Sequence, residues 1–161
     1  MLFATIIQKN GNNLAEFLSQ ILFSLCHSTL EVIKYDFLNN PEFRIGFFKL
    51  IHAIVNHCQV GLLNLEPEKF QTIIDSILFG IKHTKTDIME ISLQSLFDLN
   101  TMICNYPQIT KQFYVCFYSR ITQDLLSVLI DCEHLQEFKM QTQILKQMLY
   151  VSCNPSIDAP V

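Results

Sequence analysis

Apolar residues recur at intervals of three and four along almost the whole chain, a spacing that gathers them on one face of an α-helix. Prolines and small clusters of Asn, Asp or Thr interrupt the pattern. Only 4 glycines and 5 prolines occur in 161 residues, which argues against a turn-dense sheet protein. The periodic segments predict an all-α fold with helices over about 14–37, 41–58, 66–82, 86–105, 109–130 and 136–151.

The interruptions also predict how the helices begin. We expect Asn12 or Asn13 to cap the first helix, because a short polar side chain accepts hydrogen bonds from the free N–H groups of a first turn. Asn40 followed by Pro41 predicts the next start, and Thr86 is expected to cap the fourth helix. Buried stripes are expected at two sets of positions, Phe43, Phe47, Leu50, Ile51, Ile54 and Cys58, and Phe113, Phe117, Ile121, Leu125 and Leu129.

The helix starts form two interleaved series, near 13, 66 and 108 and near 41, 86 and 135. Their spacing approaches the roughly 40–47 residues of HEAT and armadillo repeats, which are built from helix pairs. We therefore predict an α-α superhelix, a HEAT-repeat solenoid of about three helix pairs plus a partial N-terminal helix. A compact six-helix bundle is the alternative, but nearly every helix is apolar over more than one stripe, as stacking on two sides requires. The expected organisation is one domain over 1–153, with repeats at about 13–64, 66–105 and 108–151, and a loose tail over 154–161.

Composition and charge argue against membranes and nucleic acids as partners. Half of the residues are hydrophobic and mean hydropathy is +0.27, yet no apolar run reaches the roughly 18 residues that a membrane span needs. The apolar start over 1–7 lacks a basic leader, and reads as the end of a helix rather than a secretory signal. A net charge of -4 argues against general nucleic-acid binding. We expect neither membrane insertion nor direct contact with nucleic acid.

Motifs for catalysis, metals or cofactors do not emerge, so we expect no enzyme activity, no cofactor and no metal. The 6 cysteines form no CxxC pair, and Cys26, Cys58, Cys104 and Cys116 fall in apolar stretches, which predicts reduced structural thiols of an intracellular protein. His52 and His57 are five residues apart and do not share a helix face. An α-helical enzyme or small-molecule carrier would need convergent polar groups in a pocket.

One polar surface has the spacing of a contact strip. On the predicted fourth helix, polar and acidic residues advance by three and four, which describes either the solvated side of an amphipathic helix or a surface for a basic partner. The comparable faces of the second and sixth helices carry mixed charges. The candidate contact residues are Glu42, Lys49 and Asn56; Asp87, Glu90, Gln94 and Asp98; and Lys139, Gln143 and Lys146.

Two runs of residues resemble nuclear export receptors of the importin-β (karyopherin) superfamily. The run over 40–58 shares with that family Pro41, Glu42, Arg44, Phe47, Phe48, Leu50, Ala53, Asn56, His57 and Cys58, whereas Asn40 stands where the family has Tyr. The run over 70–84 is similar to a second family segment, with Phe79 in place of its Trp. The segments 93–97 and 113–114 continue the likeness in the same order, so that it covers about residues 12–150.

The resemblance implies a piece of the C-terminal third of a longer, ring-shaped HEAT-repeat receptor. Such receptors shuttle between nucleus and cytoplasm, and carry cargo with leucine-rich export signals through nuclear pores together with Ran-GTP and nucleoporins. Their signal-binding groove and drug-reactive cysteine lie upstream of this segment, so neither role is assigned here. The resemblance implies a noncatalytic scaffold that helps to close the ring and makes secondary Ran contacts. A HEAT-repeat scaffold of another transport or regulatory complex is the alternative.

Overall fold

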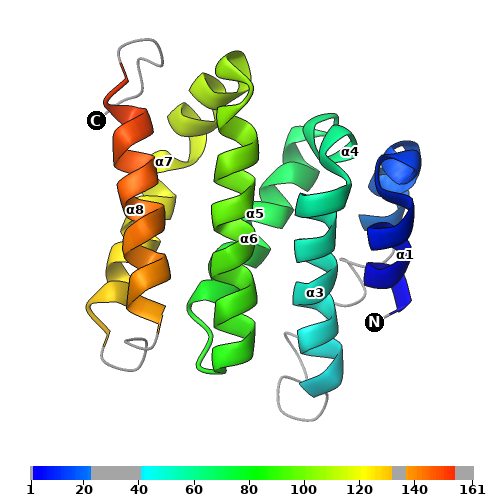
Figure 1. Cartoon of the computed structure of the whole chain (residues 1–161), viewed down its shortest axis with the longest axis horizontal. Helices are drawn as coiled ribbons and strands as arrows, with labels where there is room; N and C mark the ends of the chain where they lie inside the picture. Colours follow the sequence, from blue (N-terminus) through cyan, green and yellow to red (C-terminus); the bar gives the residue numbers. More distant parts are fainter. Residues whose placement is uncertain (1, 23–40, 132–136, 155–161) are drawn as a thin grey trace. The chain divides into compact units, whose positions relative to one another are not determined.

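The computed structural model describes residues 2–22, 41–131 and 137–154, and every regular element within these ranges is helical (Figure 1). No strand occurs in them, and the predicted all-α helical-repeat fold is confirmed. None of the described helices combines the length and hydropathy needed to cross a bilayer. The elements are α1 (Leu2–Asn10), the 3-10 helix η1 (Gly11–Phe17), α3 (Pro41–His57), α4 (Gln59–Leu63), α5 (Pro67–Ile81), α6 (Thr86–Cys104), α7 (Pro107–Leu129) and α8 (Phe138–Ser152).

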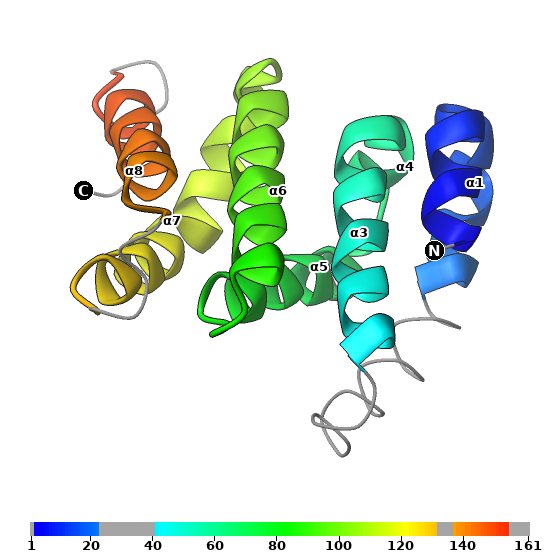
Figure 2. The same ribbon diagram turned by 60° about the horizontal axis from the view of Figure 1, so that its bottom comes forward.

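The chain divides into two compact units, Met1–Ile77 and Leu78–Val161, with the boundary inside α5. In the first unit α1 lies beside α3, and η1 packs on α4 (Figures 1 and 2). Its core is mainly aliphatic, and the side chains that are no more than 1% exposed include Ile7, Leu18, Ile51, Ile54, Leu62, Ile73 and Ile74. The first unit therefore owes its stability mainly to apolar burial across these helices.

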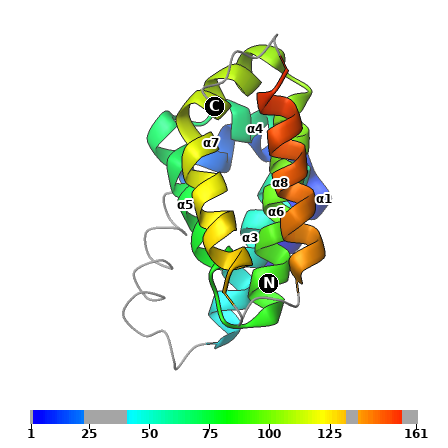
Figure 3. The ribbon, with the colours of Figure 1, turned by 90° about the vertical axis from the view of Figure 1, so that its left-hand side faces the viewer.

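In the second unit α6 and α8 lie side by side, and α7 packs against both from the other layer (Figure 3). Gln147 Nε2 on α8 donates to Thr101 Oγ1 on α6, a pair 46 residues apart in sequence, and Glu137 before α8 meets Glu90 near the start of α6. The start of α8 thus lies beside the start of α6, and its later turns lie beside the end of α6. The two helices therefore run parallel at an offset of one repeat. This is the arrangement of equivalent helices in successive helical repeats.

The N-terminal part differs from the prediction. We expected one helix from about residue 14 to 37, but α1 ends at Asn10 and the chain continues as a 3-10 helix from Gly11. Gly11 has φ +46, and a Cβ at this position would lie 2.9 Å from the carbonyl oxygen of His57. The left-handed glycine therefore ends α1 where the chain passes close to the end of α3. The remainder of the expected helix, 23–37, lies outside the described residues, as does the tail over 155–161.

Helix starts agree with the prediction more closely than the caps do. Pro67 and Pro107 open α5 and α7 at the position where the missing N–H costs no helical hydrogen bond. Thr86 was expected to cap α6, and this is wrong: Lys85 is the cap residue, without a side-chain hydrogen bond, and Thr86 is already helical. The turn before α6 is held instead by the buried His83, whose Nδ1 accepts the Lys85 N–H at 2.9 Å.

Two predicted stripes are only partly buried. In α3, Phe47 is 3% exposed as expected, but Phe43 is 64% exposed. In α7, steps of four residues advance about 40° too far per step for a helix of 3.6 residues per turn. Phe117 and Leu129 accordingly drift to half-buried positions. From Tyr114 onward the buried α7 residues alternate steps of four and three instead, over Tyr114, Tyr118, Ile121, Leu125 and Val128.

The cysteines are less uniformly internal than predicted. Cys58 is buried and Cys104 is half-buried, but Cys116 is exposed because it lies on the side of α7 opposite the buried stripe. Cys153 is exposed as well. All four described cysteines are free thiols, and Cys26 and Cys132 lie outside the described residues.

Candidate functional site

The predicted polar stripe of α6 is partly exposed. Asp87 and Glu90 are exposed in the first turns, where a negative charge also complements the helix dipole. Gln94 and Asp98 are half-buried and joined to each other, with Gln94 Nε2 donating to Asp98 Oδ1 at 2.7 Å. The N-terminal half of α6 therefore presents the acidic groups, and the next turns present a hydrogen-bonded amide and carboxylate.

The predicted residues of α8 extend this surface. Lys139, Gln143 and Lys146 are all exposed, on a helix that lies directly beside α6. Gln143 is one helical turn from Gln147, which donates to Thr101 at 3.0 Å and so joins the two helices. We name the exposed and half-buried polar residues of these helices, Asp87, Glu90, Gln94, Asp98, Lys139, Gln143 and Lys146, the α6–α8 surface.

Residues of the first unit form a separate set. Lys49 is exposed on α3, whereas Asn56 is half-buried, and its Nδ2 donates to the His52 carbonyl oxygen at 3.2 Å beside the His52 ring. The side chain of Glu42 lies outside the described residues. Because these positions belong to the other compact unit, the continuity of the predicted strip from α3 to α8 stays a prediction.

Glu137, which the sequence analysis did not single out, adds a carboxyl group to the α6–α8 surface. Partial burial raises the pKa of the Glu137 carboxyl above its ordinary value, and the negative charge and hydrogen bond of Glu90 raise it further. The repeat offset was the signal that could have found this pair, because one repeat beyond Glu90 falls on the turn before α8. Like charges here concentrate negative potential at the start of both helices.

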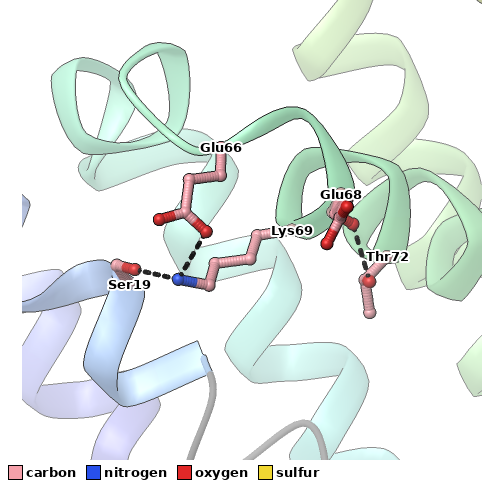
Figure 4. Close-up of polar contacts among 5 residues, drawn as sticks. All are labelled: Ser19, Glu66, Glu68, Lys69 and Thr72. Carbon is pink, nitrogen blue, oxygen red and sulfur yellow. Dashed lines mark hydrogen bonds and ion pairs between the residues drawn. The ribbon is translucent and has the colours of Figure 1, made fainter.

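Polar ties elsewhere hold the helices rather than offer a site. In the first unit, Lys69 Nζ donates to Ser19 Oγ at 2.6 Å and pairs with Glu66 at 2.9 Å, so it links residue 19 to the start of α5 (Figure 4). In the second unit, Lys82 at the end of α5 pairs with Asp124 of α7. Both lysines therefore form ion pairs with carboxylates of the same chain.

A buried polar cluster lies between α6 and α7. The Tyr114 hydroxyl donates to Asn100 Oδ1 at 2.9 Å and also contacts the Cys104 thiol. Burial raises the pKa of Tyr114 well above its usual range and also raises that of Cys104, so both stay neutral in ordinary buffers. The Asn100 Nδ2 has no hydrogen-bond partner within the described residues. Neutral groups packed between two helices in this way fix helix packing and make poor nucleophiles.

The described ranges bring together no group of three metal-ligating side chains. They contain a hollow of about 480 Å³ along α7, lined by residues of that helix alone, Tyr114, Val115, Tyr118, Ser119, Thr122, Gln123 and Leu126. Thr122 Oγ1 is buried there without a hydrogen-bond partner among these residues. The side chains named for this hollow include no carboxylate, imidazole, thiol or amine group.

Comparison with known proteins agrees with the helical-repeat fold. A family model described as CRM1 C terminal matches residues 1–161. The chain is 34% identical over 161 residues to exportin-1 of Schizosaccharomyces pombe, which covers 99% of this chain and 15% of that relative. It is 31% identical over 162 residues to protein EXPORTIN 1A of Arabidopsis thaliana, again with 99% and 15% covered. Exportin-1 of Drosophila melanogaster is 26% identical over 154 residues, with 96% and 14% covered.

The chain thus spans about 15% of the length of the fission-yeast and Arabidopsis relatives. The match to the family model is nevertheless continuous from the first residue to the last, and the helical-repeat fold accords with it. The chain belongs to the CRM1 C-terminal family of nuclear export receptors.

Proposed function

We propose that this chain is a noncatalytic scaffold segment of a receptor that carries cargo with leucine-rich export signals out of the nucleus. The receptor works with Ran-GTP, passes nucleoporins in the pore, and shuttles between nucleus and cytoplasm. The observation that carries the proposal is the match of the CRM1 C-terminal family model to the entire chain. The parallel α6–α8 pair supports it, because stacked repeats build extended surfaces for macromolecular partners.

Within that receptor the segment helps to close the ring and makes secondary contacts with Ran-GTP. The α6–α8 surface is the proposed contact, because it joins exposed acids on α6 to exposed lysines on α8. Charges of both signs on one face favour a single orientation of a partner and speed its association, while adding little affinity. A secondary contact is expected to have these properties. Glu42, Lys49 and Asn56 are proposed to serve the same role on α3.

Charge reversal tests the surface. Asp87→Lys with Glu90→Lys is expected to weaken binding to immobilised Ran-GTP while leaving the thermal midpoint nearly unchanged, since surface substitutions usually cost less than about 0.5 kcal/mol. Glu16→Lys with Glu68→Lys is the matched control, because these exposed acids lie in the first unit and the change in net charge is the same. Glu68 also lies in the first turn of its helix, as Asp87 does. Equal losses in both pairs would mean that net charge, and not this surface, governs the contact.

The scaffold role has its own test. A fluorescent peptide with a leucine-rich export signal is expected to show no saturable binding to the 161-residue chain. The apolar stripes lie mainly buried between its helices, and exposed apolar side chains such as Phe43, Ile130 and Tyr150 belong to different parts of the fold. A groove for such a peptide would need a row of exposed apolar pockets. Saturable, sequence-dependent peptide binding would contradict the scaffold role. Absence of Ran-GTP binding in a parallel measurement would favour a scaffold of a different complex.

A further inference from the structure

We draw no further inference here: the strongest candidate, the hollow along α7 between Tyr114 and Leu126 with the buried Thr122 hydroxyl in its wall, is an unpartnered helix face, and nothing in the structure shows what covers it.

Discussion

The hydroxyl of Tyr114 provides a sharp test of how the α6–α7 layer is held. The Tyr114 ring is fully buried, with its centroid 5.9 Å from Phe113 and 5.8 Å from Tyr118, and its hydroxyl donates to Asn100 Oδ1. Tyr114→Phe keeps the ring and removes only the hydroxyl. It leaves Asn100 with a buried oxygen unpaired beside a Nδ2 that already has no partner in the described part of the chain.

A buried polar atom that loses its hydrogen bond costs about 1–3 kcal/mol. With a urea m-value of about 2 kcal/mol/M, this loss lowers the unfolding midpoint by about 0.5–1.5 M. The assay is equilibrium urea unfolding followed by far-UV circular dichroism at 25 °C. The m-value should stay constant, because removing one oxygen atom leaves the area exposed on unfolding unchanged.

Tyr118→Phe is the matched control. Tyr118 lies one turn further along α7, is 9% exposed and stacks on Tyr114, but its hydroxyl makes no hydrogen bond within the described ranges. This variant should stay within about 0.5 kcal/mol of the parent chain. Adding Asn100→Leu to Tyr114→Phe should restore most of the loss, because replacing both partners with apolar groups leaves nothing unpaired. Equal midpoints for Tyr114→Phe and Tyr118→Phe would show that the hydrogen bond from Tyr114 to Asn100 does not stabilise the fold.

Other predictions concern the cores and the acidic pair. Phe47→Ala should lower the free energy of unfolding by about 3–5 kcal/mol, because Phe47 is 3% exposed; an unchanged thermal midpoint would show that its helix face is misassigned. Gly61→Ala should destabilise by about 1–3 kcal/mol in urea unfolding, because the new Cβ would lie 2.9 Å from the Ala15 Cα; a rise in stability would mean that η1 moves away easily. Glu137 has a raised pKa in the folded chain, so its contribution is favourable below about pH 4.5 and is lost as the pH rises through the folded-state value. Glu137→Gln should therefore raise the thermal midpoint at pH 7 and have little effect below pH 4, whereas a gain that is equal at both pH values would exclude repulsion from Glu90 as its cause.

The long helices could be predicted from the sequence because their signals are local. Spacing of three and four residues, together with Pro67 and Pro107, placed α5 and α7 within two residues of their observed starts. The 3-10 helix over Gly11–Phe17 could not be read in the same way. Gly11 has a positive φ and lies close to the carbonyl oxygen of His57, a residue far along the chain, and sequence periodicity carries no information on such a contact.

The candidate surface was predictable in part for the same reason. The exposed positions of Asp87, Glu90, Lys139 and Lys146 follow from helix periodicity alone. The contact between Glu90 and Glu137 depends on the offset between α6 and α8. The repeat period read from the sequence predicts this offset only approximately. The pairing of Asn100 with Tyr114 depends on how α6 crosses α7, and no sequence spacing encodes that crossing.

We propose that this chain is a receptor segment that contacts Ran in its GTP form. Titration of Ran, loaded with either a non-hydrolysable GTP analogue or GDP, into the 161-residue chain tests it most directly by calorimetry. We expect weak, saturable binding of the GTP form that falls with added salt, because exposed charges make the contact, and no binding of the GDP form. Equal binding of both forms, or binding of neither, would contradict it.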